Sequence, residues 1–326
     1  MTCGDVYIKS ALRQDERLLS YGEPQGEADL RDTLADYVRE RRNVLCSGED
    51  IVIGAGIQSL LHILCPLLEQ RQTVSFPNPS FVQGSTVFHD YGFQIDYRNK
   101  DCDIIYVSPA HMTKWGDIMP VSRRLELVNY SAAHGSLVIE DDLKMNLCIC
   151  RSYPFSFWSG GRSECSVSGN LFQTSAALHP YQLYGSASGA SALYRKKADQ
   201  YNQTASKAEQ IALCQFIRDG HLAAQTRKLK RLYSVKLKAL RSAVREVFGK
   251  DAQIQTGAAG TSLALTLSTT LTWQELQKKA QTNGLRLQLL REAPGKITLI
   301  LSCSSMPVAD FVPACKLLKD ISQIQN

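Results

Sequence analysis

The chain has 326 residues, of which 44% are hydrophobic and 21% are charged. This is an ordinary globular composition, and the length suits one large domain with a smaller one. Residues 1–17 are polar and lack the apolar core of a secretory signal peptide, and no apolar run approaches membrane-spanning length. The ten cysteines are therefore expected to be reduced thiols of a cytoplasmic protein.

Basic residues are concentrated in one run near residue 230, within a net charge of +6. The run contains Arg227, Lys228, Lys230, Arg231, Lys236 and Lys238. It predicts a solvated helix face, and a nucleic-acid patch is the alternative. No helix-turn-helix or zinc-finger signature accompanies it, so direct DNA binding is not expected. Cys148 and Cys150 are close together and lack a second cysteine or histidine pair, so no metal site is expected.

The first 142 residues predict strands that alternate with helices. Helices are predicted over residues 26–42, 59–69 and 122–133. Short apolar strands are predicted over residues 51–53, 73–76, 93–97, 103–107 and 136–139. Ser122 is expected to cap the third of these helices and Gly135 to end it. The alternation predicts an α/β fold, with a mostly parallel sheet covered by helices on both faces.

Ligands of such sheets bind beyond the carboxyl ends of the strands. Residues 54–58, residues 109–111 and Asp141 all fall at such ends. We therefore expect a binding site to be built from these three segments.

The region 144–193 interrupts this pattern, because it is rich in Ser, Gly, Cys and Tyr and shows no clear strand or helix period. Regular patterning resumes near Tyr194. Helices are predicted over 203–218 and 225–248, and strand and helix patterns then alternate over 262–267, 272–282, 296–302 and 308–321. The tail therefore predicts a compact α+β lobe. We expect a large domain with an N-terminal arm over 1–240 and a small domain over 241–326.

Several short stretches resemble one known family. They are residues 21–26 followed by Leu30 and Arg31, the turn 56–58, the segment 79–81, the segment 107–111 with Gly116, the pair Arg123 and Arg124, the segment 138–142, and the basic helix 225–233. Together they resemble the fold-type I pyridoxal 5'-phosphate (PLP) enzymes, the aspartate-aminotransferase superfamily. Within it they look most like the aminotransferase-like domain of MocR-type (GntR-family) bacterial regulators.

The resemblance implies PLP as cofactor and a role for each matching residue. Gly56, Ile57 and Gln58 match the turn whose backbone N–H groups hold the cofactor phosphate at a helix N-terminus. Phe81 matches the aromatic ring that stacks on the pyridine, and His111 matches a polar residue that faces it. Asp141 matches the carboxylate that keeps the pyridine nitrogen protonated, although an ordinary capping acid is the alternative.

The sequence departs from the family at the Schiff-base lysine. The family has this lysine in a Gly-Thr-Phe-Ser-Lys motif, and the matching position here is Gln173. A glutamine amide cannot form an imine, so no catalytic residue is assigned and PLP is not expected to be held covalently. The family also has a tyrosine after its acid pair, where this chain has Leu143, and Lys144, Lys196 and Lys197 are no obvious substitutes.

One hypothesis explains these departures together. Degenerate back-translation of residues 168–186, read with a shift of one nucleotide, permits a Ser-Lys pair, an arginine at the family's offset and an apolar strand. On this hypothesis residues 144–193 are translated out of frame relative to the ancestor, through compensating insertions and deletions or a sequencing error. The underlying nucleotide sequence tests this hypothesis, which is wrong if no one-base shift there encodes Ser-Lys.

Three functions follow from the resemblance. The first is an aminotransferase by descent, acting on or sensing an amino acid as a homodimer, with catalysis impaired at Gln173. The second is a non-catalytic effector-sensing domain of a MocR-type regulator, for which residues 1–21 are too short to hold a winged helix. The third is a decayed fragment.

Overall fold

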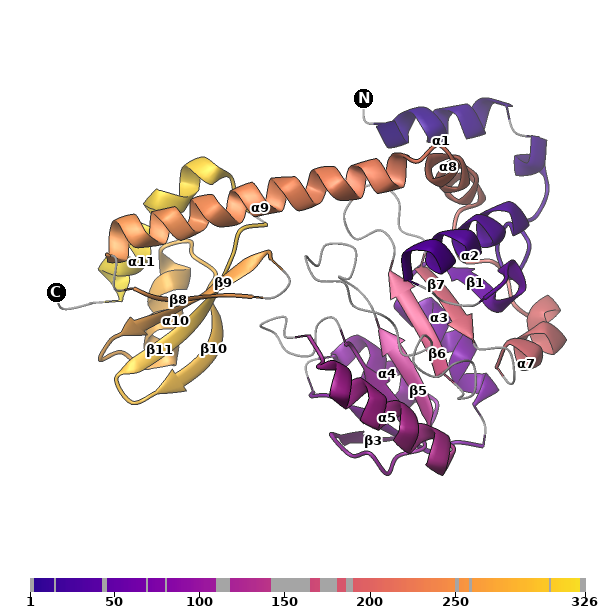
Figure 1. Cartoon of the computed structure of the whole chain (residues 1–326), viewed down its shortest axis with the longest axis horizontal. Coiled ribbons are helices and arrows are strands. Elements are labelled where there is room, and N and C mark those ends of the chain that lie inside the picture. The colour runs from indigo at the N-terminus through magenta and orange to yellow at the C-terminus, as the bar shows by residue number, and fades with distance from the viewer. Residues whose placement is uncertain are drawn as a thin grey trace. The chain divides into compact units, whose positions relative to one another are not determined.

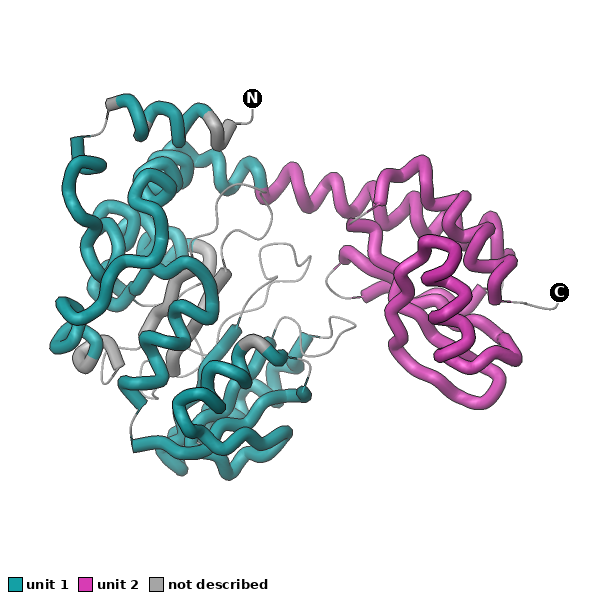
Figure 2. The backbone as a smooth tube through the Cα atoms, turned by 180° about the vertical axis from the view of Figure 1, so that it is seen from behind, with its two compact units in different colours: residues 1–112, 118–146, 152–225 teal, residues 113–117, 147–151, 226–326 magenta. Residues whose placement is uncertain are grey.

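The computed structural model describes residues 3–14, 16–42, 46–68, 70–79, 81–109, 118–141, 165–170, 181–185, 190–249, 252–257, 260–304 and 306–322. These residues form two compact units (Figure 2). The large unit contains the described residues up to Gln225, and the small unit contains those from Thr226 onward. The domain boundary expected from the sequence, at residue 240, and the boundary in the structure both fall within one helix, His221–Phe248.

The large unit is built on a seven-stranded sheet with the order β1-β7-β6-β5-β4-β2-β3 (Figure 1). Its strands are β1 (Ile51–Gly54), β2 (Thr73–Phe76), β3 (Gln94–Tyr97), β4 (Ile104–Val107), β5 (Leu137–Asp141), β6 (Cys165–Asn170) and β7 (Tyr181–Gly185). Only β7 runs antiparallel to both of its neighbours. The carboxyl ends of the other six strands therefore lie along one edge, and the predicted mostly parallel α/β sheet is confirmed.

Helices cover both faces of this sheet. The α-helices described in the large unit are α1 (Cys3–Gln14), which packs on α8, then α2 (Ala28–Arg42), α3 (Ile57–Leu64), α4 (Val82–Asp90), α5 (Val121–His134), α7 (Ala190–Lys197), α8 (Lys207–Arg218) and the first residues of α9 (His221–Phe248). Side chains of α2, α5 and α8 share one core with the strands, whereas those of α3, α4 and α7 share the other.

Neighbouring residues of a strand alternate between the two cores. In β4, Ile105 and Val107 belong to the core with α2, whereas Ile104 and Tyr106 belong to the core with α3. A strand buried on both faces must be apolar at every position, which is why β1 and β4 stand out in the sequence as short apolar runs.

Residues 165–170 and 181–185 form two strands that the sequence does not predict. β6 pairs in parallel with β5, and β7 lies between β6 and β1. The structure thus has two strands and the start of α7 within the region 144–193, where the sequence shows no clear strand or helix period. Backbone pairing with neighbouring strands decides a strand more than its own side-chain pattern does.

The starts of helices α8 and α5 also differ from the sequence-based expectation. Helix α8 begins at Lys207 rather than at residue 203, because Ser206 is its N-cap and accepts a hydrogen bond from the Glu209 nitrogen at 3.5 Å. Helix α5 begins at Val121 with Pro120 as N-cap, so Ser122 is not the cap. Its C-cap is Gly135, which has a left-handed φ of 67°, as helix ends commonly require. Helix α1 has no counterpart in the predicted elements.

The small unit has a four-stranded antiparallel sheet with the order β10-β11-β9-β8. Besides the larger part of α9, its strands and α-helices are β8 (Gln253–Thr256), β9 (Ser262–Ser268), α10 (Trp273–Thr282), β10 (Gln288–Ala293), β11 (Lys296–Ser302) and α11 (Phe311–Ile321). Leu265 faces Leu299 across β9 and β11, and both belong to a core that α9, α10 and α11 share. The predicted second domain of α+β type is confirmed.

None of the helices in the described part of the chain combines the length and the apolar composition that a bilayer span requires. Among the same residues, no three His, Cys, Asp or Glu side chains gather as a metal site. The pair Cys148 and Cys150 lies outside the described residues.

Candidate cofactor site

The turn between β1 and α3 requires glycine at two positions. A Cβ on Gly54 would lie 2.8 Å from Cδ2 of Leu60, which is closer than packing allows. Gly56 is the N-cap of α3 and has a φ of 121°, which residues with a side chain rarely adopt. The turn thus brings bare backbone to the N-terminus of α3, where N–H groups and the helix dipole favour an anion.

A threonine from a distant segment is bonded to this turn. The Ala55 nitrogen donates a hydrogen bond to Oγ1 of Thr204 at 3.0 Å. Thr204 lies in the loop before α8, where the sequence predicts helix, and sequence reasoning did not select it. The run of small polar residues before α8 was the available signal, since such residues bond to backbone groups in loops.

The segment 21–26 supports the other side of the turn. The side-chain amide of Gln25 donates to the carbonyl oxygens of Glu49 (2.9 Å) and Ile51 (2.8 Å), and the Gln25 carbonyl accepts from the Ile53 nitrogen at 2.9 Å. Gly26 has a φ of 103°, and a Cβ there would lie 2.7 Å from Cδ1 of Ile53. The N-terminal motif therefore binds along β1 and holds the strand that leads into the turn.

Arg31 fixes this motif from a buried position. Its side chain is 7% exposed. It donates to the carbonyl oxygens of Gly26 and Gly48, each at 2.9 Å, and to Oε2 of Glu23 at 2.9 Å. A buried guanidinium needs several acceptors, and the turns around β1 supply them.

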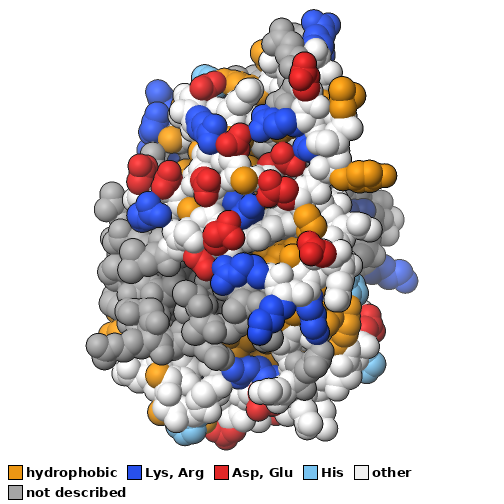
Figure 3. Space-filling view, turned by 90° about the vertical axis from the view of Figure 1, so that its right-hand side faces the viewer, with side chains coloured by type: hydrophobic (Ala, Val, Ile, Leu, Met, Phe, Trp, Pro, Cys, Tyr) orange, Lys and Arg blue, Asp and Glu red, His pale blue; other side chains and the backbone are white. Residues whose placement is uncertain are grey.

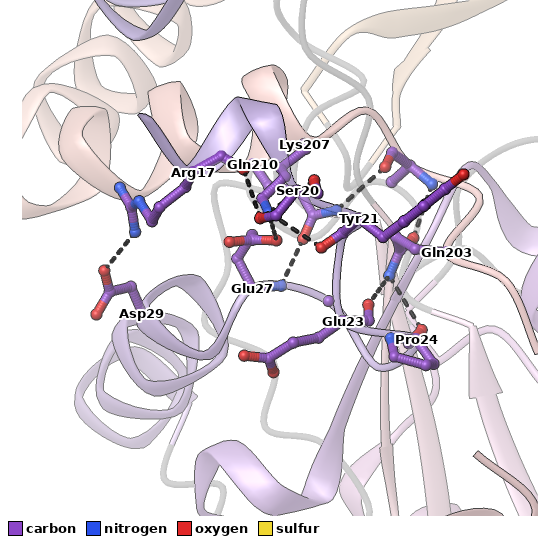
Figure 4. Close-up of polar contacts among 12 residues, drawn as sticks. Arg17, Ser20, Tyr21, Glu23, Pro24, Glu27, Asp29, Gln203, Lys207 and Gln210 are labelled. Atoms are coloured by element: carbon purple, nitrogen blue, oxygen red, sulfur yellow. Dashed lines mark hydrogen bonds and ion pairs between the residues drawn. The ribbon is translucent and has the colours of Figure 1, made fainter. Parts of the chain in front are cut away.

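Lys207, the first residue of α8, is bonded to the same motif (Figure 4). Its Nζ donates to the Ser20 carbonyl (3.2 Å), the Ser20 hydroxyl (3.0 Å) and the Tyr21 carbonyl (3.2 Å). It also lies 3.6 Å from Oε1 of Glu27, and these two side chains are 15% and 9% exposed. The start of α8 and the N-terminal motif are thus held together on the side of Thr204.

Phe81, Tyr106 and Asp141 form a continuous series of contacts from β2 to β5. The ring of Phe81, the N-cap of α4, stacks on the Tyr106 ring with centroids 5.0 Å apart and planes at 25°. The Tyr106 hydroxyl donates to Oδ2 of Asp141 at 3.0 Å. Asp141 is 8% exposed at the end of β5. A Cβ on Gly84 would collide with the Phe81 ring, so the glycine leaves the ring its place.

The other expected site residues divide into two groups. Ile57 packs against the core with α3, so its contribution to the turn is its backbone N–H, and the Gln58 side chain is exposed at the start of the same helix. His111, Gln173 and Leu143 lie outside the described residues. The structure therefore places Gly56, Ile57, Gln58, Phe81 and Asp141 along the carboxyl edge of one sheet.

The titratable groups packed behind α3 do not ionise near neutral pH. Burial raises the pKa of the Cys65 thiol to about 12. Burial, followed by the nearby Tyr201, raises the pKa of Tyr194 to about 12. Neither group is a nucleophile behind the turn.

Comparison with known proteins shows which families this chain resembles. The family described as aminotransferase class I and II matches residues 5–107. The HTH-type transcriptional regulator YdeL of Bacillus subtilis is 26% identical over 96% of this chain and 71% of its own length. The probable rhizopine catabolism regulatory protein MocR of Rhizobium meliloti is 22% identical over 84% of this chain and 59% of its own length. The chain is an aminotransferase-like relative of the MocR-type regulators.

Solved structures show the same fold. An archaeal alanine:glyoxylate aminotransferase superposes with a TM-score of 0.78, with 17% identity over 99% of this chain and 87% of its own. The α-aminoadipate aminotransferase LysN of Thermus thermophilus, complexed with N-(5'-phosphopyridoxyl)-L-leucine, superposes with a TM-score of 0.74, with 17% identity over 98% of this chain and 87% of its own. The fold-type I architecture of this aminotransferase-like chain is therefore shown.

Proposed function

We propose that this aminotransferase-like chain binds PLP without a covalent bond and binds an amino-acid-like molecule beside it. Its ability to transaminate is impaired. The observation that carries the proposal is the alignment, along one edge of a parallel sheet, of a glycine turn at a helix N-terminus with a buried carboxylate at the end of β5. One end suits a phosphate and the other a protonated ring nitrogen.

The residues present fit the chemical groups of this cofactor. The N–H groups of Gly56 and Ile57 would hold the phosphate, because Gly56, which has no side chain and a φ of 121°, begins the helix there. Phe81 would lie against the ring, and Asp141 would keep a proton on the ring nitrogen. When bound, PLP supplies an electron sink for the substrate carbon, and that proton is what makes it effective.

Tyr106 assists Asp141 in this proposal. Its hydroxyl donates to the carboxylate and favours the charged form of Asp141, which is the form that attracts a protonated nitrogen. Thr204 assists the turn, because its hydroxyl oxygen accepts the hydrogen bond of the Ala55 nitrogen and so fixes that peptide next to Gly56. His111 and Gln58 complete the proposed cofactor-binding set.

Impaired catalysis follows from the residue type at position 173. An amide nitrogen is neither a nucleophile nor a proton carrier at neutral pH, so Gln173 can provide neither of the two functions of a Schiff-base lysine. Cytoplasmic location and a homodimer, which the family resemblance implies, belong to the same proposal.

Sensing is the second candidate function. Both YdeL and MocR are named as regulators, and each of them aligns with most of the length of this chain. A site that binds PLP and an amino acid without turnover suits an effector-sensing domain, because binding energy rather than chemistry is what such a domain uses. Where PLP binds and no turnover occurs with any amino acid, this function is favoured over catalysis.

The proposal is tested by titrating the protein with PLP and then treating it with borohydride. We expect a change in protein fluorescence that saturates, loss of PLP on dialysis, and no PLP-labelled peptide by mass spectrometry. No saturable binding would contradict the cofactor, and a labelled lysine would contradict non-covalent attachment.

Gln173→Lys gives a second test. By itself it should not restore turnover, because the family's arginine and the tyrosine at the Leu143 position are absent as well, and small misplacements already cost about a hundredfold in rate. Replacing 144–193 with the frame-restored segment should restore a borohydride-reducible link to PLP and half-transamination with some amino acid. Turnover by Gln173→Lys alone would contradict the frame-shift hypothesis.

A further inference from the structure

The net charge of this chain is divided unequally along its length. Residues 226–326 contain 16 Lys and Arg and 6 Asp and Glu, a net charge of +10. Residues 1–225 contain 21 Lys and Arg and 25 Asp and Glu, a net charge of −4. This unequal division of charge between two parts of a chain favours a polyanionic partner for the basic part. Not every face is one-sided in charge, since acidic and basic side chains are interspersed on the face that Figure 3 shows.

The positive charge is gathered on one side of α9. Between residues 226 and 245 this helix has eight Lys and Arg and no acid, and Glu246 is the first. At 3.6 residues per turn, five of the basic side chains fall within about 40° of one line along the helix. These five are Arg227, Arg231, Lys238, Arg241 and Arg245, and we call them the basic stripe. At 1.5 Å per residue the stripe is about 27 Å long.

All five side chains of the basic stripe are exposed. The ion pairs between described residues do not include any of them. Lys228 and Lys230, also exposed, flank the stripe. The opposite side of α9 packs into the core of the small unit through Tyr233, Leu240 and Val244. The charge is therefore held along a straight line by a helix whose other side is fixed.

We propose that the basic stripe of α9 binds the phosphate backbone of duplex DNA without reading base sequence. The stripe is exposed, as expected of a solvated helix face. The proposal departs only from the expectation of no direct DNA contact, because five exposed charges, in no ion pair with another described residue, lie along one line. Duplex DNA presents about one negative charge per 1.7 Å of axis and is stiff over about 500 Å, so it can follow a straight stripe without loss of its own conformational freedom.

Other polyanions fit less well. Single-stranded nucleic acid is bound by stacking on exposed aromatic rings, whereas the two aromatic residues of α9, Tyr233 and Phe248, pack against the core. An anionic bilayer is bound by helices that insert a broad apolar face, whereas most apolar side chains of α9 pack into the small unit and leave Leu232 and Val235 as its exposed large hydrophobic residues. An acidic peptide would lose conformational entropy on becoming ordered along the stripe.

The test is fluorescence anisotropy of a labelled 24-base-pair duplex titrated with the full chain at 50 and 200 mM NaCl. If the stripe neutralises five phosphates, affinity should fall about 500-fold between the two salt concentrations. The stripe variant is Arg231→Gln/Lys238→Gln/Arg241→Gln. With two contacts left, its affinity should fall only about 12-fold over the same range, and it should bind more weakly at 50 mM.

The matched control is Lys278→Gln/Arg286→Gln/Lys296→Gln, which removes the same charge from exposed positions on other elements of the small unit. It should retain most of the wild-type affinity, and two duplexes of unrelated sequence should bind equally. Circular dichroism and thermal melts verify that both variants fold.

Three results would overturn the proposal. They are no binding of duplex DNA at 50 mM NaCl, an equal loss of affinity in the control and stripe variants, and binding of phosphatidylglycerol vesicles or polyglutamate in preference to DNA. None of these measurements requires PLP, so the inference stands or fails separately from the proposed function.

Discussion

The hydroxyl of Thr204 accepts a hydrogen bond from the Ala55 backbone nitrogen at 3.0 Å, across 149 positions of sequence. Ala55 lies between the two glycines that shape the turn at the N-terminus of α3. The loop before α8 therefore restrains a peptide group immediately beside the proposed phosphate site, although it belongs to none of the segments that mark the family.

Thr204→Val should weaken PLP binding about tenfold, because one hydrogen bond that orients the turn is lost while the shape of the side chain is kept. Thr204→Ser retains the hydroxyl and should bind PLP nearly as well as the wild type. Fluorescence titration with PLP measures both. Equal affinities for the valine and serine variants would remove Thr204 from the site.

Gly56→Val should weaken binding of both PLP and inorganic phosphate by at least about tenfold. A valine at a φ of 121° strains the backbone by on the order of 1–3 kcal/mol, and its side chain adds bulk at the phosphate position. Gly92→Val is the control, because Gly92 also has a positive φ, 81°, but lies in an open turn after α4. If both variants bind equally well, the turn does not hold the phosphate.

The sequence predicts most readily the strands whose residues are buried on both sides, although it also predicts the largely exposed β3. β1 and β4 were identifiable because every position of Ile51–Gly54 and Ile104–Val107 is buried and hence apolar. β8 and β10 were not, because they are largely exposed and have polar residues such as Gln253 and Arg291. β6 and β7 depend on pairing with β5 and β1, which no local pattern contains.

The candidate site shows the same division. Gly56, Phe81 and Asp141 were selected because they occupy short motifs at strand ends. Tyr106 and Thr204 were not selected, because their importance comes from contacts with residues distant in sequence. The proposed roles of His111 and Gln173 still rest on the family resemblance alone.

Asp141→Ala should weaken binding of PLP about tenfold or more and leave the affinity for inorganic phosphate unchanged, because the carboxylate is proposed to meet the ring nitrogen and not the phosphate. Tyr106→Phe should have a smaller effect in the same direction, since it removes one donor to the carboxylate. Competition between PLP and phosphate separates the two sites. Unchanged PLP affinity in Asp141→Ala would mean that the acid is only structural.

Protonation of Asp103 should make the large unit less stable in acid. Its carboxylate accepts hydrogen bonds from the nitrogens of Gln72 (2.9 Å) and Thr73 (3.0 Å) and from the Thr73 hydroxyl (2.8 Å). The backbone hydrogen bond from Gln72 is the largest cause that lowers the pKa of Asp103 below its usual 3.8. A carboxyl group whose pKa is lowered by folding stabilises the native state above its unfolded pKa, and this stabilisation is lost as the pH falls through the folded pKa.

Asp103→Asn should therefore lower the free energy of unfolding by about 1 kcal/mol at pH 7, because the amide replaces a charged acceptor of three hydrogen bonds by a neutral one. The difference from the wild type should be constant down to about pH 5 and should shrink below about pH 4. Urea unfolding at a series of pH values measures it, with Asp90→Asn as a control for the loss of an exposed carboxylate elsewhere in the unit. A difference that stays constant to pH 3, or widens in acid, would show that the starts of β2 and β4 do not depend on the charge of Asp103.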